Sequence, residues 1–126
     1  MRVLVDTSVW VDHFKNRNEA LVRLLLQEQV LTHPMIRVEL VCGTPPEPRR
    51  KTLDNIGLLY SSKQVGLDEV MEFIEHKELY GLGCGLVDLV LLCSTLVMPN
   101  AKLWTLDKRL AGLAERFGVA YLSGLH

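Results

Sequence analysis

Hydrophobic residues in this chain gather either in short unbroken runs or in longer stretches with helical spacing. The short runs, such as Val3-Leu4-Val5, predict strands that are buried on both faces, because they do not alternate with polar residues. The strands expected from this pattern cover residues 2–5, 29–32, 63–67, 102–105 and 119–122.

The longer stretches predict helices. Leu21, Leu24 and Leu25 lie at helical spacing, while Pro34 suits the first turn of a helix that Gly43 would end. The expected helices cover residues 7–15, 18–29, 34–43, 49–59, 68–80, 86–98 and 107–117. Helices that alternate with short apolar strands predict an α/β sandwich around a parallel sheet.

The composition is that of a single globular domain spanning residues 1–126. Hydrophobic residues make up 48% of the chain and charged residues 23%, which excludes a disordered protein. The formal net charge of -1 provides no overall basic field. It counts mildly against a nucleic acid as partner, although a local basic surface is enough for an enzyme.

Several features favour a cytoplasmic protein without membrane contact. The charge of Asp6 comes too early for a signal peptide. The apolar run of residues 86–98 contains Asp88 and is too short to cross a bilayer, so we expect a buried helix there. The number of cysteines is odd and their spacing does not suit zinc, so we expect reduced core thiols at Cys42, Cys84 and Cys93.

Four acidic residues lie where the surrounding sequence is apolar. Asp6 follows the first strand and Asp107 follows the fourth, while Asp88 and Glu39 lie in apolar helices. A carboxylate is rarely buried unless it is paired or bound to a metal ion. Ligand sites of parallel sheets lie beyond the carboxyl ends of the strands. Asp6 and Asp107 would therefore share one edge of the sheet, and the two helices could reach it.

Each of these acids also has an ordinary structural interpretation. Asp6 and Asp107 could cap the helices that follow them, and Asp88 could favour its helix dipole. Glu39 could pair with Arg37. The placement of two acids at one sheet edge, with two more on helices that could reach it, argues against a purely structural role for all four.

Carboxylates gathered at one point raise each other's pKa, and a hard divalent cation such as Mg²⁺ or Mn²⁺ relieves their repulsion. Such an ion could position a phosphodiester and activate a water molecule, and two ions could act on both ends of the bond. Zinc is disfavoured because the histidines are isolated from one another along the sequence. They are His13, His33, His76 and His126.

The four acids lie in segments that occur in a recognisable order along nearly the whole chain. These segments are residues 5–10, 37–40, 85–88 and 104–110. They resemble the motifs of the PIN-domain ribonucleases, and more narrowly those of the VapC toxins of bacterial toxin–antitoxin systems. The resemblance implies a PIN-like three-layer α/β/α sandwich with a short, mostly parallel central sheet.

The resemblance also implies a Mg²⁺- or Mn²⁺-dependent endoribonuclease, the toxin of a type II toxin–antitoxin pair. Its expected partners are an RNA substrate, a cognate VapB-like antitoxin and a second copy of the chain in a homodimer. The implied catalytic residues are Asp6, Glu39, Asp88 and Asp107, of which Asp6, Asp88 and Asp107 would bind the metal. The implied supporting hydroxyls, which could instead cap helices or bond strand ends, are Thr7, Ser8 and Thr105.

The sequence departs from the family pattern after the fourth acid. Many relatives carry a further acid there, whereas Lys108 and Arg109 follow Asp107 in this chain. This difference favours one firmly held metal ion over two. Lys108 and Arg109 are candidate RNA contacts, and residues 49–51 form a second basic cluster that could contact RNA or simply be solvated.

Two other functions remain as alternatives. A phosphatase of the haloacid dehalogenase type would use Asp6 as nucleophile, but that family requires a second Asp two residues later, where this chain has Ser8. A non-catalytic PIN-like module could bind RNA or a protein without cutting it. The presence of all four acids argues against the second alternative.

Overall fold

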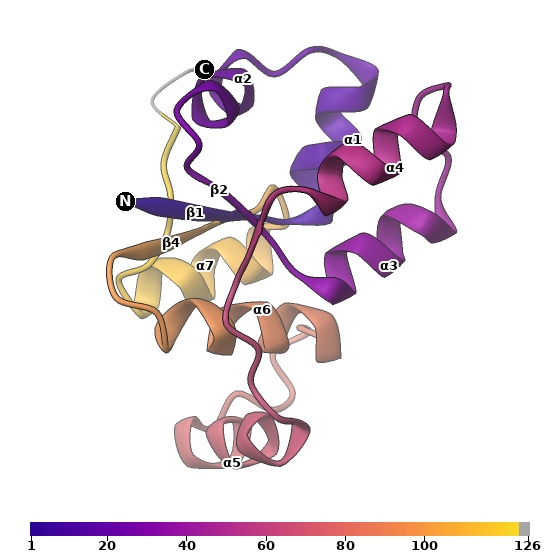
Figure 1. The fold of residues 1–126 in the computed structure, drawn as a ribbon. Coiled ribbons are helices and arrows are strands. Elements are labelled where there is room, and N and C mark those ends of the chain that lie inside the picture. The colour runs from indigo at the N-terminus through magenta and orange to yellow at the C-terminus, as the bar shows by residue number, and fades with distance from the viewer. Residues whose placement is uncertain (124–126) are drawn as a thin grey trace.

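The computed structural model describes residues 1–123 and contains one four-stranded sheet (Figure 1). The strands are all parallel and stand in the order β3-β2-β1-β4. Their bounds are β1 (Arg2–Val5), β2 (Val30–Thr32), β3 (Tyr60–Ser61) and β4 (Ala101–Trp104). Residues 124–126, which include His126, lie outside the described part of the chain.

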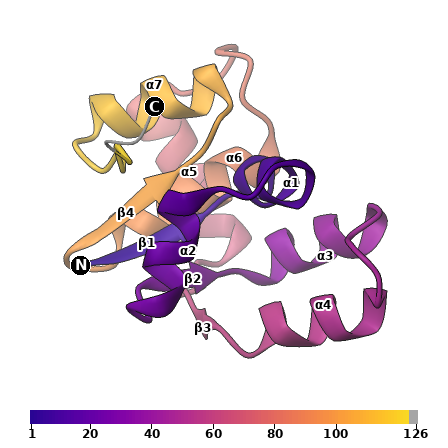
Figure 2. The ribbon, with the colours of Figure 1, turned by 90° about the horizontal axis from the view of Figure 1, so that it is seen from above.

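Helices cover both faces of the sheet and confirm the three-layer α/β/α sandwich. Figure 1 shows α1 and α2 above the strands and α6 and α7 below them, with α5 packed on the outer side of α6. In Figure 2, α3 and α4 form a hairpin beyond the carboxyl end of β2. The bounds are α1 (Thr7–Lys15), α2 (Glu19–Leu26), α3 (Pro34–Cys42), α4 (Arg49–Gly57), α5 (Leu67–Lys77), α6 (Leu86–Leu96) and α7 (Lys108–Arg116).

The order of the strands reverses between β1 and β4. The chain moves outward from β1 through β2 to β3, then returns to place β4 on the other side of β1. Ligand sites of such sheets lie beyond the carboxyl ends of the strands, where the strand order reverses in this way. Because Val5 pairs with Trp104, β1 and β4 end level with each other, and the residues that follow them lie at the same edge of the sheet.

The core explains why these strands are uninterrupted apolar runs. Val3, Leu4 and Val5 are fully buried, since helices cover both faces of the central strand β1. Residues 89–95 of α6 are also buried, which confirms the expected buried helix. None of the helices in residues 1–123 is long and apolar enough to span a bilayer.

Two expected strands differ in the structure. The strand expected at 63–67 is wrong, and β3 lies just before it at Tyr60–Ser61. Its partner β2 ends at Thr32 because Pro34 begins α3, so the backbone beyond Ser62 has no strand to pair with. Residues 119–122 form only a single parallel bridge between Ala120 and Leu103.

Candidate active site

Asp6 lies at the carboxyl end of the central strand and is 6% exposed. Its side chain does not cap α1, although its backbone occupies the N-cap position. Oδ2 of Asp6 instead accepts hydrogen bonds from Ser8 Oγ and Thr105 Oγ1, each at 2.7 Å. The structural alternative of a helix-capping carboxylate therefore does not describe Asp6.

The hydroxyls of Ser8 and Thr105 connect Asp6 to the turn before α7. Ser8 Oγ accepts a hydrogen bond from the backbone N–H of Leu106 at 2.9 Å. Thr105 Oγ1 accepts one from the N–H of Asp107 at 3.0 Å. Each hydroxyl thus donates to the Asp6 carboxylate and accepts from a backbone N–H. The same group can therefore orient the carboxylate and bond the backbone after β4.

Glu39 reaches the same edge of the sheet from α3. Its Oε1 accepts a hydrogen bond from Thr7 Oγ1 at 2.6 Å, which links α3 to the first residue of α1. Glu39 is otherwise exposed and forms no ion pair with Arg37 or any other cation among residues 1–123. Thr7, the residue after Asp6 in the chain, therefore holds the Glu39 carboxylate.

Asp107 does have the structural role that its position suggested. Its Oδ1 accepts a hydrogen bond from the backbone N–H of Leu110 at 3.0 Å and so caps α7. The carboxylate that ends the β4 turn is thus held by its own helix. The same side chain is exposed, so capping and ligand binding do not exclude each other.

Asp88 lies in the first turn of α6, and the other three acids affect its pKa. Burial is the main cause that raises its pKa above the ordinary value of 3.8, and a hydrogen bond with the Gly85 backbone opposes this increase. The negative charges of Asp6, Asp107 and Glu39 raise the pKa further. The fold therefore brings all four acids close enough to interact electrostatically.

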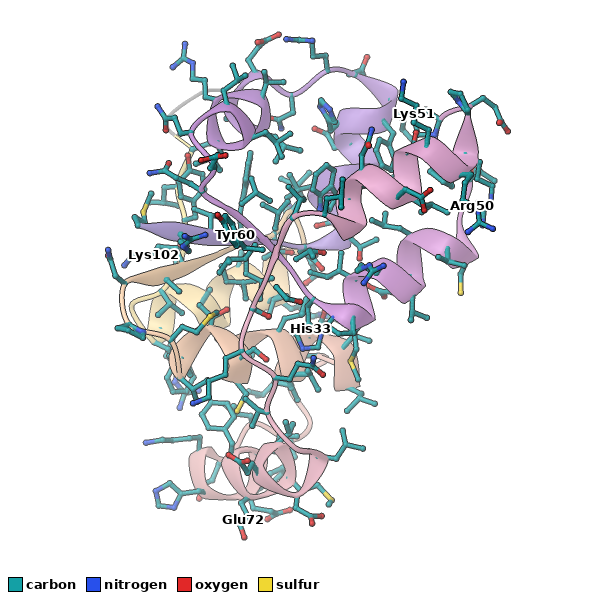
Figure 3. The ribbon with its side chains drawn as sticks, viewed as in Figure 1. His33, Arg50, Lys51, Tyr60, Glu72 and Lys102 are labelled. Carbon is teal, nitrogen blue, oxygen red and sulfur yellow. The ribbon has the colours of Figure 1, made fainter. Side chains whose placement is uncertain are left out.

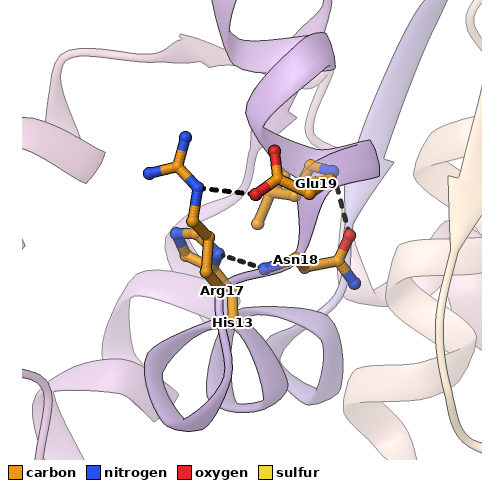
Figure 4. Close-up of polar contacts among 5 residues, drawn as sticks. His13, Arg17, Asn18 and Glu19 are labelled. Atoms are coloured by element: carbon orange, nitrogen blue, oxygen red, sulfur yellow. Dashed lines mark hydrogen bonds and ion pairs between the residues drawn. The ribbon is translucent and has the colours of Figure 1, made fainter.

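Cations do not neutralise this cluster through ion pairs. The ion pair formed within residues 1–123 joins Arg17 to Glu19 at 2.8 Å, at the corner between α1 and α2 (Figure 4). In the same corner, the N–H of Asn18 donates to Nδ1 of His13. The four acids lack such a partner, and oxygen donors of this kind suit a hard divalent cation.

The acids do not form a tight cage. Among residues 1–123, no three Asp, Glu, His or Cys side chains converge closely enough to hold a metal ion as they stand. The hydrogen bonds given above provide a reason, because Oδ2 of Asp6 faces two hydroxyls and Oδ1 of Asp107 faces the α7 backbone. The donor chemistry fits the expected metal, whereas a preformed coordination sphere is not present.

Histidines and cysteines stand apart from this chemistry. His33 is buried and caps α3 by accepting from the N–H of Met35, and burial lowers its pKa below 6.5 (Figure 3). Burial raises the pKa of the Cys84 thiol above 9.0, and the charges of Asp88 and Asp107 raise it further, so this thiol stays protonated. Cys93 is buried as expected, whereas Cys42 is exposed, so the expectation of a core thiol there is wrong.

The candidate RNA contacts lie on the exposed start of α7. Lys108 and Arg109 are both exposed, and Nη1 of Arg109 lies 3.4 Å from the carbonyl oxygen of Gly83, to which it donates. Gly83 has a φ of +85°, and a Cβ there would come within 2.7 Å of the same Nη1. This contact could not be predicted from the sequence, because it pairs a glycine loop with a helix that is distant along the chain.

The second basic cluster is divided between two environments. Arg49 donates to the carbonyl oxygens of Val41 and Gly43, so it caps the carboxyl end of α3. Arg50 and Lys51 are exposed on α4, where Figure 3 labels them. Arg49 therefore has a structural role, and only its two neighbours remain free for a ligand.

The chain is similar to known proteins over almost its full length. Two of them are called Ribonuclease VapC32 and come from Mycobacterium tuberculosis, strains CDC 1551 / Oshkosh and ATCC 25618 / H37Rv. Each is 39% identical to this chain over 118 residues, which cover 94% of this chain and 94% of the relative. No family model matches the chain. The similarity thus extends well beyond the segments around the four acids.

Proposed function

This chain belongs to the VapC-like PIN-domain ribonucleases, and we propose on that basis that it is an endoribonuclease that hydrolyses RNA phosphodiester bonds. The observation that carries the proposal is the gathering of Asp6, Asp107 and Glu39 around Asp88, whose pKa is raised mainly by burial and further by these three charges. A site that concentrates negative charge without cationic partners gains stability from a bound divalent cation. Such a site suits metal-assisted attack on a phosphodiester.

Asp6, Asp88 and Asp107 would hold Mg²⁺ or Mn²⁺, and Glu39 would lie beside them. When bound, the ion would neutralise the phosphate and lower the pKa of a water molecule. The protein's own contribution is orientation. Thr105 and Ser8 hold Oδ2 of Asp6, and Thr7 holds Oε1 of Glu39 at 2.6 Å. Glu39, which is exposed and is not among the expected metal ligands, would accept a proton from the attacking water.

The biological setting follows from the same family membership. We infer that the chain is the toxin of a type II toxin–antitoxin pair, acts in the cytoplasm as a homodimer and is silenced by a VapB-like antitoxin. Co-purification from cells that co-express candidate VapB-like proteins tests the antitoxin, and light scattering tests the dimer. A monomer that binds none of these proteins would contradict this part of the proposal.

The decisive experiment compares Asp6→Asn with Glu75→Gln, which removes an exposed acid from α5. A fluorescent single-stranded RNA is incubated with each protein and Mg²⁺, and then with EDTA. We expect cleavage by the natural chain and by Glu75→Gln, and its loss in Asp6→Asn and in EDTA. Cleavage that persists in both of the latter would refute a metal-dependent nuclease.

The two alternatives fare differently. The residue that a haloacid-dehalogenase-type phosphatase would need as an acid is Ser8, and its hydroxyl donates to Asp6 as a structural group. We therefore do not propose phosphatase chemistry. A non-catalytic RNA- or protein-binding module is an outcome of the experiment above, supported if calorimetry detects no binding of Mg²⁺ or Mn²⁺.

A further inference from the structure

A groove of about 280 Å³ opens between α1 and α3 and is lined by Glu39, one of the four acids. Val11 and Phe14 of α1 form one wall, and Leu40 of α3 contributes to the other. The proline turn after α3 closes the outer side with Pro45 and Pro46. The groove therefore presents mainly flat or branched apolar surfaces, and it is open to solvent.

This groove is continuous with the proposed active site. Glu39 lines the groove, and its carboxylate accepts the hydrogen bond from Thr7 at 2.6 Å. Thr7, Val11 and Lys15 follow one another at four-residue spacing, so they lie on one face of α1. The groove thus extends along α1 from Glu39, which Thr7 holds, toward Lys15, and Thr7 and Lys15 are about 12 Å apart along the helix.

The two ends of the groove carry opposite charge. Glu39 marks the inner end, and Lys15 lines the groove at the end of α1. Lys15 is exposed and forms no ion pair within residues 1–123. A ligand that fits must therefore offer a flat apolar group for the middle of the groove and a negative charge at the end distant from the acids.

We propose that this groove binds one unpaired nucleobase of the RNA substrate, close to the bond that is cut. The base would stack between Phe14 and the proline turn, and Lys15 would contact a neighbouring phosphate. Stacking of this kind tolerates different bases, because every base offers an aromatic face. The inference rests on the proposed nuclease function and extends it to how the substrate is held.

The test fills the groove without touching the acids. Val11 is 40% exposed and Val97, at the end of α6, is 42% exposed, so Val11→Phe and Val97→Phe are a matched pair. The substrate is a defined fluorescent oligoribonucleotide that the natural chain cuts. We expect Val11→Phe to raise KM about tenfold with kcat nearly unchanged, since one stacked base contributes about this much affinity. Val97→Phe should behave like the natural chain.

Lys15 is tested through the salt dependence of binding. Lys15→Gln is compared with Lys77→Gln, because each lysine is the last residue of an exposed helix end. Binding of the same RNA is measured by anisotropy in the Asp6→Asn background, which keeps the RNA intact. Loss of one phosphate contact should reduce the slope of log K against log salt by about 0.7 for Lys15→Gln alone.

A second measurement leaves the protein unaltered. Single bases of the oligoribonucleotide are removed one at a time, and we expect kcat/KM to fall at one position near the cut. Equal KM for Val11→Phe and Val97→Phe, together with no base-dependent position, would overturn the groove while leaving the nuclease intact. A natural chain that neither cuts nor binds RNA would instead refute the proposed function. Weaker binding of a protein partner alone to Val11→Phe would assign the groove to that partner.

Discussion

Charged side chains have different surroundings at the two edges of the sheet, which are formed by the amino and the carboxyl ends of the strands. At the amino edge, the guanidinium of Arg2 lies 4.3 Å from the centre of the Tyr60 ring, and Lys102 Nζ donates to the carbonyl oxygen of Gly118 at 3.0 Å (Figure 3). At the carboxyl edge of the same strands, Asp6 and the acids around it have no ion-pair partner among residues 1–123. Charge that the fold has satisfied locally contributes to structure, whereas charge left without a counterion is available to a ligand.

The largest effect should come from removing one charge at the carboxyl edge. Asp88→Asn is expected to reduce RNA cleavage about 100-fold or more, because a site residue is lost. The same change should raise the melting temperature in EDTA, since the raised pKa shows that the charged form is disfavoured in the fold. Cleavage assays and thermal melting measure the two effects. A lower melting temperature in EDTA would contradict the view that burial and the neighbouring charges disfavour the Asp88 carboxylate.

The next effect concerns the hydroxyl that holds Asp6. Thr105→Val keeps the shape of the side chain and removes its hydrogen bond to the carboxylate. A hydrogen bond to a charged group contributes about 1.5–3 kcal/mol, so we expect kcat/KM to fall at least tenfold.

Thr95→Val serves as its control. Thr95 is buried in α6, and its hydroxyl donates to the backbone of Leu91. This substitution should alter stability without a specific loss of kcat/KM. Similar kcat/KM values for the two variants would show that Thr105 does not orient Asp6.

A smaller effect, seen only in acid, should come from His33 at the end of β2. Burial lowers its pKa from the ordinary 6.5, so the unfolded chain binds a proton that the folded chain resists. The free energy of unfolding should therefore be highest above pH 6.5 and should fall as the pH drops below it. His33→Asn keeps an N-cap acceptor and removes this titration. Denaturant unfolding at several pH values should show a shallower dependence for His33→Asn.

The smallest effect should arise at the amino edge. Arg2→Gln removes the contact with Tyr60, which is worth about 0.5–1 kcal/mol at an exposed site. We expect the melting temperature to fall by roughly 2–4 °C and RNA cleavage to stay the same. If RNA cleavage fell by more than the smaller fraction of folded protein explains, the amino and carboxyl edges of the sheet would be coupled.

The sequence predicted what depends on local pattern. The apolar run of β1 and the helix start at Pro34 appear in the structure as expected, because each is set by neighbouring residues. The position of β3 did not follow from its own residues, since it depends on where β2 ends. The exposure of Cys42 likewise depends on how the α3–α4 hairpin packs, and its apolar neighbours gave no warning of it.

The candidate site shows the same division. Four acids in apolar surroundings were visible in the sequence, and so was the edge where Asp6 and Asp107 meet. The sequence could not show that the Asp107 side chain caps its helix while that of Asp6 does not. Nor could it show that Arg49 donates hydrogen bonds to carbonyl oxygens at the end of α3, or that Glu39 lines a groove. Both features depend on contacts between helices.

The hydrogen bond between Thr105 and Asp6 joins residues that are 99 positions apart. During synthesis on the ribosome, the central strand β1 leaves before its neighbour β4 and before the turn that carries Thr105 and Asp107. A chain released between these two points has Asp6 and Ser8 but lacks Thr105, the second hydroxyl that holds Asp6. The four acids can therefore gather only in a chain that has been translated past Asp107.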